Sequence, residues 1–268
     1  MVCMSATVVT ALYDIGRDKF DADRTMEDYL HWFGKTLALN VPMVIFTQEK
    51  YKDFITQHRD AHDTKIIVMP LQETPYYKYK DKMDHVLESA HYRAKMQDTN
   101  RIECKMSLYS ILQYSKFEWL NVAAQQDHFN TPYFFWLDAG GSRFFQDLDP
   151  SKPWPSNYKL LNSNKFNIQG NYNTVRWVRE KLPYDMYENN CILVGGLFGG
   201  TKEICIKTAQ LVNNAFEHHL EQGVFNNEQI LLGTLLLQDH KPFNVYIELD
   251  GTPLPFLRSL GQHAQDKE

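Results

Sequence analysis

The chain has 268 residues and a formal net charge of −5, with 43% hydrophobic and 23% charged residues. This length suits one large α/β domain or two small ones, and the apolar content excludes a globally disordered chain. The acidic balance excludes nucleic-acid binding through the usual basic surface, so lysine, arginine, helix N-termini or a metal must meet any phosphate-bearing ligand locally.

Cysteine usage and the absence of long apolar runs indicate the compartment. Cys3, Cys104, Cys191 and Cys205 lie far apart without a C-x-x-C pair, which disfavours a zinc site and fits free thiols in a reducing compartment. Residues 1–10 lack the pattern of a signal peptide, and no apolar run approaches the roughly 18 residues that span a bilayer. We therefore expect a soluble, cytoplasmic protein, in the host cytoplasm if the chain is viral.

The first part of the chain alternates between strand and helix patterns. Apolar runs predict strands over residues 6–12, 41–47 and 65–71, and apolar residues at helical spacing predict helices over residues 25–40, 48–58 and 82–97. Elements that alternate at this rhythm connect through right-handed crossovers. We therefore expect the α/β class, with a mostly parallel central sheet flanked by helices.

A long helix is predicted over residues 101–124 because its apolar residues recur on one face. Arg101 and Lys105 would stand in its first turns, on the side of that apolar face. Cations near a helix N-terminus are mildly unfavourable, and an anion in front of them would reverse that sign. The alternative is that they pair with nearby carboxylates such as Asp98 or Glu103.

The segment that follows this helix carries the most informative pattern. Five aromatic or apolar residues at positions 133–137 run without a break into Asp138, and Gly140 and Gly141 follow. Such a run predicts a strand buried on both faces of a sheet. Ligands of open α/β sheets bind at the carboxyl ends of strands, so Asp138 would face that crevice, where glycines let the backbone approach a ligand. The alternative is that Asp138 only starts a turn.

The second half is less regular. The patterns predict an irregular excursion over residues 147–164, a short helix over residues 174–182, a strand over residues 191–198, helices from Thr201 to about Gln222 and from Asn226 to Leu237, and a strand over residues 243–249. Residues 167–173 are polar and give no clear assignment. The tail from residue 251 contains prolines and then charges, and we expect it to fray.

Polar residues and glycines recur at the predicted strand ends and helix starts, and each has two interpretations. Tyr13 and Asp14 end the first strand, Gly195 and Gly196 interrupt a late strand, and Glu228 stands in the first turn of a helix. Asp14 could cap a turn, and the glycines could serve tight packing. Glu228 would be favoured by the helix dipole whatever its function.

Five segments occur in a characteristic order: Leu-Tyr-Asp-Ile-Gly-Arg at 12–17, Lys105, Trp-Leu-Asp-Ala-Gly at 136–140, Gly-Gly-Leu-Phe-Gly-Gly at 195–200, and Asn-Glu-Gln at 227–229. In this order and spacing the chain resembles the HtrL/YibB (WlaTC-like) family and, more broadly, the GT-A nucleotide-sugar glycosyltransferases. The resemblance covers about residues 6–249.

The resemblance implies one GT-A-like (Rossmann-like) domain over residues 1–268, in which residues 1–145 bind the nucleotide sugar, residues 146–255 bind the acceptor and residues 256–268 form a tail. It implies a glycosyltransferase that moves a sugar from a nucleotide-diphosphate donor, with a UDP-sugar as first choice, to a hydroxyl of a glycan or polysaccharide. It implies neither a nucleic-acid partner nor a membrane span.

The resemblance also implies roles for individual residues. Thr10, Leu12, Tyr13 and Asp14 would face the nucleotide, Arg101 and Lys105 the phosphates or donor sugar, and Gly140, Gly195 and Gly196 the donor and acceptor pocket. Asp138 would hold a divalent cation, Mn²⁺ or Mg²⁺, that stabilises the leaving diphosphate. Glu228 would be the catalytic carboxylate, which takes the acceptor proton in an inverting transfer.

Position 140 departs from the GT-A pattern, since glycine replaces the second aspartate of Asp-x-Asp. Either one carboxylate, water and phosphate oxygens suffice for the cation, or the enzyme works without one. Because of this departure, a catalytically silent carbohydrate-binding protein remains an alternative function. A metal-dependent phosphohydrolase or nucleotidyltransferase would need a second carboxylate beside Asp138, or a glycine-rich nucleotide loop with an early lysine.

Overall fold

A seven-stranded sheet forms the centre of the computed structural model, which describes residues 6–20, 24–248 and 254–262. The strands are β1 (Ala6–Leu12), β2 (Met43–Thr47), β3 (Thr64–Val68), β4 (Tyr133–Leu137), β5 (Phe166–Gly170), β6 (Leu193–Thr201) and β7 (Phe243–Tyr246). Their order across the sheet is β3-β2-β1-β4-β6-β5-β7. Strands β3, β2, β1 and β4 are parallel, β6 is antiparallel to both its neighbours, and β7 is parallel to β5.

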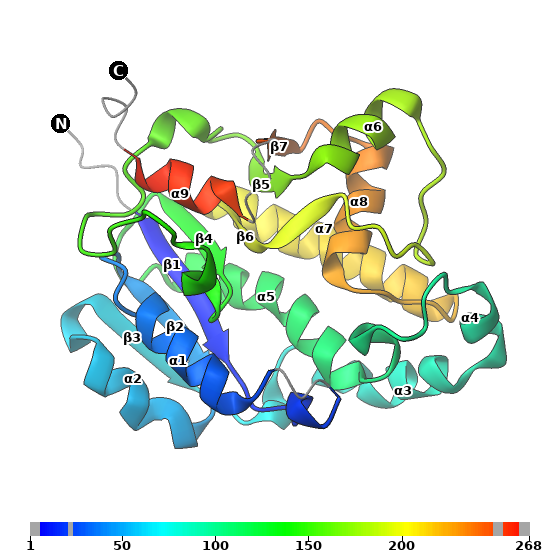
Figure 1. Cartoon of the computed structure of the whole chain (residues 1–268), viewed down its shortest axis with the longest axis horizontal. Helices are drawn as coiled ribbons and strands as arrows, with labels where there is room; N and C mark the ends of the chain where they lie inside the picture. Colours follow the sequence, from blue (N-terminus) through cyan, green and yellow to red (C-terminus); the bar gives the residue numbers. More distant parts are fainter. Residues whose placement is uncertain (1–5, 21–23, 249–253, 263–268) are drawn as a thin grey trace.

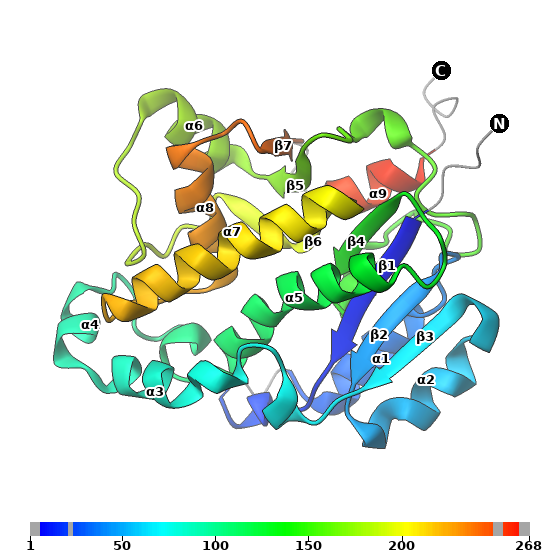
Figure 2. The ribbon, with the colours of Figure 1, turned by 180° about the vertical axis from the view of Figure 1, so that it is seen from behind.

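Helices cover both faces of this sheet. They are α1 (Met26–Thr36), α2 (Lys52–His58), α3 (Lys80–Glu88), α4 (Ala90–Lys95), α5 (Ser107–Gln126), α6 (Tyr172–Glu180), α7 (Lys202–Glu221), α8 (Glu228–Gln238) and α9 (Pro255–Gly261). Helices α1 and α9 lie in front of the sheet in Figure 1, whereas α5 and α7 lie side by side over the opposite face in Figure 2. The predicted α/β class, with a mostly parallel sheet flanked by helices, is confirmed.

Two apolar cores form because successive side chains of a strand point to opposite faces. In β4, Phe134 and Trp136 pack toward α5 and α7, whereas Phe135 and Leu137 pack toward α1 and α9. All five residues of β4 are buried, as its unbroken apolar run predicts. Among the described residues, no helix is both long and apolar enough to cross a membrane.

Several boundaries differ from the sequence-based prediction. The long helix begins at Ser107, because residues 102–104 form a separate 3₁₀ turn, and the predicted helix over residues 82–97 divides into α3 and α4 at Ser89. The ambiguous segment at residues 167–173 contributes most of β5, whose polar Asn167 and Gln169 are buried and hydrogen-bonded. The predicted last strand ends at Tyr246, and Leu249 lies outside the described residues.

The prediction that the chain frays from residue 251 is wrong for residues 255–261, which form α9. Phe256, Leu257 and Leu260 are fully buried in the core on the α1 face. Trp154 fixes the helix because its indole Nε1 donates to the Leu257 carbonyl at 3.0 Å. Pro255 is the first residue of α9, where a proline is well tolerated, and the apolar face of the helix outweighs the polar composition of the residues that follow it.

We predict that Leu257→Ala lowers the free energy of unfolding by about 2–5 kcal/mol, since it leaves a cavity in a closed core. Urea unfolding followed by circular dichroism measures the change, with Gln262→Ala at the partly exposed end of the same segment as the control. Equal stability of the two variants would contradict the docking of α9.

Candidate functional site

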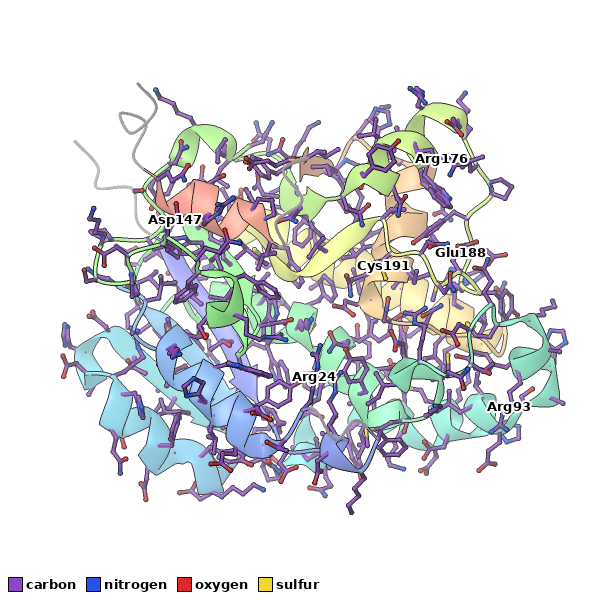
Figure 3. The ribbon with its side chains drawn as sticks, in the orientation of Figure 1. Arg24, Arg93, Asp147, Arg176, Glu188 and Cys191 are labelled. Carbon is purple, nitrogen blue, oxygen red and sulfur yellow. The ribbon has the colours of Figure 1, made fainter. Side chains whose placement is uncertain are left out.

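A cavity of about 160 Å³ opens at the carboxyl ends of β1 and β4. Its walls come from the end of β1, the following turn, the start of α1, the middle of α5 and the loop after β4: Ala11, Leu12, Tyr13, Asp14, Ile15, Arg17, Asp18, Arg24, Met26, Tyr29, Tyr109, Leu112, Gln113, Lys116, Trp119, Trp136, Asp138, Ala139, Gly140 and Arg143. In Figure 3, Arg24 lies between α1 and α5. The cavity therefore occupies the crevice at which ligands of open α/β sheets bind.

Asp138 faces this cavity with 38% of its side chain exposed. Its backbone N–H donates to the Gly196 carbonyl of β6 at 3.0 Å, and the indole Nε1 of Trp136 donates to its Oδ1 at 2.7 Å. The turn that follows is fixed by α1, because the Thr36 hydroxyl donates to the Ala139 carbonyl at 2.8 Å. Strand pairing and a helix contact thus hold the carboxylate in place.

Lys116 joins Asp138 to Glu228 in the interior. Its Nζ lies 3.0 Å from Asp138 Oδ1 and 2.8 Å from Glu228 Oε1, and it also donates to the Gly195 carbonyl at 3.2 Å. The Lys116 side chain is 4% exposed and that of Glu228 only 1%. We call Lys116, Asp138 and Glu228 the buried triad.

The charges of the triad are coupled. Burial alone would lower the pKa of the Lys116 ammonium, but the carboxylates of Asp138 and Glu228 outweigh burial and raise it. Burial raises the pKa of Glu228, and Lys116 opposes part of that rise. Because the pKa of Lys116 is raised, this residue stays cationic at neutral pH.

Glu228 begins α8 but does not line the cavity. The side chain of Asn227 caps the helix by accepting from Ile230 N at 3.0 Å. Glu228, the first residue of the helix, then points into the interior. A Cβ at position 195 would lie 2.2 Å from Glu228 Oε1, so a larger residue there would displace the Glu228 carboxylate. Glu228 Oε2 is buried and has no hydrogen-bond partner among the described residues.

Three of the four residues predicted to face a nucleotide line the cavity, namely Leu12, Tyr13 and Asp14. The ring of Tyr13 stacks on Trp119 with centroids 5.4 Å apart and planes 7° apart. Thr10 does not line the cavity, because it is fully buried within β1. The contact of Thr10 with a nucleotide stays a prediction, which this cavity does not support.

Arg101 and Lys105 also lie away from the cavity, so its lining gives no support to the prediction that they face a donor. The helix that was expected to carry them begins at Ser107, after both residues. Arg101 pairs with Glu103, which is the alternative that the sequence left open. Lys105 is exposed and borders a separate hollow beside Tyr92.

Among the predicted glycines, only Gly140 lines the cavity. Gly195 and Gly196 lie behind it, where their carbonyls accept from Lys116 Nζ and from the Asp138 backbone N–H. Their carbonyls therefore help to position the triad, but neither glycine forms part of the cavity wall.

Sequence reasoning missed Lys116, Arg24 and Arg143, which line the cavity, and it gave no role to Arg17, which ends the segment at 12–17 and lines the cavity too. Lys116 had a detectable signal: it lies four residues after Leu112 and three before Trp119, both on the predicted buried face of the helix. A charged residue on such a face needs a buried partner. The arginines had no comparable signal, since they lie in irregular segments.

The described residues do not fit a divalent-cation site built by the protein. Hard cations such as Mg²⁺ and Mn²⁺ take oxygen ligands, usually with at least one or two carboxylates. Among the residues that the structure describes, no three His, Cys, Asp or Glu side chains gather for a metal. The Asp138 Oδ1 already accepts from Trp136 and adjoins Lys116. Asp138, the predicted ligand of Mn²⁺ or Mg²⁺, thus belongs to no group of three such side chains in the described part of the chain, and the Lys116 ammonium lies between it and Glu228.

Comparisons with known proteins cover most of the chain. The model of a family described as "Bacterial protein of unknown function (HtrL_YibB)" matches residues 4–251. The chain is 22% identical to Protein HtrL of Escherichia coli (strain K12) over 235 residues, which cover 84% of this chain and 81% of that protein. Apo mouse xyloside xylosyltransferase 1 is similar in structure with a TM-score of 0.37 and 11% identity, covering 91% of this chain and 84% of that one.

We predict that Lys116→Met lowers the free energy of unfolding by about 3–5 kcal/mol, since it leaves a buried carboxylate unpaired. The loss should be smaller at acidic pH. The folded-state pKa of Glu228 is already above its unfolded value, so the folded state binds more protons and stability falls as pH rises through that interval.

Denaturant unfolding at pH 5 and pH 8 measures both effects. The double variant Lys116→Met/Glu228→Gln is the matched control, because it removes the buried charge and should recover most of the loss. A double variant no more stable than Lys116→Met would contradict the coupling.

Proposed function

The chain belongs to the HtrL_YibB family, whose function is unknown, and from the geometry of its site we propose that it is a glycosyltransferase. The donor is a nucleotide-diphosphate sugar, with a UDP-sugar as the first choice, and the acceptor is a glycan hydroxyl. The single observation that carries this proposal is the composition of one cavity, which combines an aromatic surface, arginines and the half-exposed Asp138.

Each part of that composition suits one part of such a donor. Tyr13, backed by Trp119 and Trp136, offers an aromatic surface to a base or a sugar ring. The basic side chains of the cavity suit phosphate oxygens. Asp138 is the only acidic residue of the triad that lines the cavity, so it suits the acceptor hydroxyl.

In the proposed transfer, Asp138 accepts the proton of the acceptor hydroxyl as that oxygen forms a bond to the anomeric carbon. The bond from the anomeric carbon to the diphosphate breaks at the same time, and the nucleoside diphosphate leaves with the electron pair. Lys116 holds the Asp138 carboxylate in position. Glu228, 1% exposed behind Lys116, acts as the residue that anchors the lysine.

The triad disfavours the alternative of a phosphohydrolase that holds metal ions between carboxylates. The structure does bring a second carboxylate, Glu228, near Asp138, but the Lys116 ammonium occupies the position between them. A bound cation there would have to displace a buried ion pair, which costs several kcal/mol.

We predict that Asp138→Asn lowers the transfer rate by about 100-fold or more, because the amide cannot accept the acceptor proton. Thermal shifts with UDP-, GDP- and CMP-sugars select the donor, and release of the nucleotide then gives the rate. Asp63→Asn is the control, since Asp63 pairs only with His62 among the described contacts. If Asp138→Asn retains the wild-type rate and melting curve, Asp138 is not the base.

We also predict that the transfer rate in EDTA stays within about twofold of the rate with Mn²⁺, whereas loss of an essential Lewis acid would remove several kcal/mol of transition-state stabilisation. The same nucleotide-release assay measures both rates. A rate that falls to background in EDTA and returns with Mn²⁺ would show that Asp138 and the ligand do hold a cation.

A further inference from the structure

Three arginines line the mouth of the cavity, and we call Arg17, Arg24 and Arg143 the arginine cluster. The Arg17 guanidinium lies 4.9 Å from the ring centroid of Tyr109, and its Nη1 donates to the Tyr29 hydroxyl at 2.9 Å. The cluster comes from three separate segments: the turn after β1, the residue just before the N-cap of α1, and the loop after β4. The fold therefore brings Arg143 to two arginines that lie more than a hundred residues before it in the sequence.

Arg143 is held by neutral groups. Its Nε donates to the Gly140 carbonyl at 3.0 Å, and its guanidinium lies 4.6 Å from the ring centroid of Trp32 and 5.1 Å from that of Phe144. In the part of the chain that the structure describes, it forms no ion pair with a carboxylate. Its terminal nitrogens keep donors for a ligand in the cavity.

Glycine at position 140 makes room for this arrangement. A Cβ at that position would lie 3.1 Å from both Nε and Nη2 of Arg143, which is tighter than ordinary contact. The guanidinium can therefore pack directly on the turn that follows Asp138. The guanidinium of Arg143 thus packs against position 140, where the GT-A pattern has its second aspartate.

The electrostatics of the cluster favour an anion. Burial, and then the neighbouring charges of Arg24 and Arg17, lower the pKa of Arg143, while the Tyr29 hydroxyl and Asp138 oppose this effect. Among the described residues, two carboxylates that line the cavity pair with lysines, Asp14 with Lys50 and Asp138 with Lys116. Asp18 is exposed at the rim. An anion bound at Arg143 would offset the effect of these like charges on its guanidinium.

We infer that the arginine cluster binds the diphosphate of the donor directly and supplies the positive charge without a protein-bound metal. This inference rests on the proposed function for the identity of the donor. The guanidinium matches phosphate oxygens with pairs of parallel hydrogen bonds, and three of them suit two linked phosphates better than one. It replaces the predicted roles of Arg101 and Lys105.

Isothermal titration calorimetry of the full chain with inorganic pyrophosphate in EDTA tests the inference without any sugar transfer. Wild type should bind pyrophosphate more tightly than inorganic phosphate. Arg143→Gln should weaken binding of pyrophosphate by about tenfold or more, as expected for the loss of charge-assisted hydrogen bonds. Lys105→Gln, which changes a basic residue outside the cavity, should leave it unchanged.

Arg143→Lys provides a second variant if the glutamine disturbs the loop, and it should weaken binding although the charge remains, since lysine lacks the planar fork. The inference is overturned if wild type does not bind pyrophosphate in EDTA, if it binds phosphate equally well, if both Arg143 variants bind like wild type, or if Lys105→Gln weakens binding as much as they do. Pyrophosphate binding without transfer from any sugar nucleotide would remove the proposed function and leave the anion site standing. Transfer at the wild-type rate by Arg143→Gln would remove the role of the arginine cluster and leave the proposed function standing.

Discussion

The ion pairs of Lys116 connect the parts of the molecule on which the site depends. The lysine comes from the middle of α5, and its partners come from the end of β4, the start of α8 and the Gly195 carbonyl of β6. A buried ammonium with two carboxylates gains stability only when the geometry satisfies its donors, and here all three donors have an acceptor. One side chain therefore fixes the Asp138 carboxylate, the Glu228 carboxylate and the Gly195 carbonyl relative to one another.

The charges of the site divide into an interior and a rim. Inside, the protein supplies an acceptor for each donor of Lys116, and one face of Asp138 is left toward the cavity. At the rim, Arg17 lies over the Tyr109 ring, and Arg143 packs on Trp32 and the Gly140 carbonyl, which leaves its terminal nitrogens for a ligand. This division suits a reaction that removes a proton from one substrate and stabilises negative charge on another. It also accounts for glycine at position 140, where a side chain would meet the guanidinium of Arg143.

The sequence predicts the strands of the parallel half and the place of Asp138 well, because an unbroken apolar run that ends in a carboxylate has few other interpretations. It fails where tertiary contacts override local pattern. β5 is polar in sequence and buried in the fold, because its side chains bond to neighbouring backbone and to Asn244. Helix α9 lies in a tail of unpromising composition, because three apolar residues meet a core that the sequence does not reveal.

The site illustrates the same limit. Leu12, Tyr13, Asp14, Asp138 and Gly140 line the cavity as expected, since each follows or ends a recognisable strand. Arg101 and Lys105 were placed on the helix by periodicity, and a start six residues later, at Ser107, removes them from it. Arg17, Arg24 and Arg143 come from turns and loops. They lie close together because β1 and β4 are neighbours in the sheet, which no local spacing in the sequence reveals.

A crystal structure of the chain with a bound nucleoside diphosphate, grown in EDTA, tests the central claim most directly. The account predicts that the diphosphate lies within hydrogen-bonding distance of the Arg143 guanidinium, with the base beside Tyr13 and the Asp138 carboxylate facing the open side of the terminal phosphate. A nucleotide bound at the Lys105 surface, or a diphosphate that contacts none of the three arginines, would contradict it.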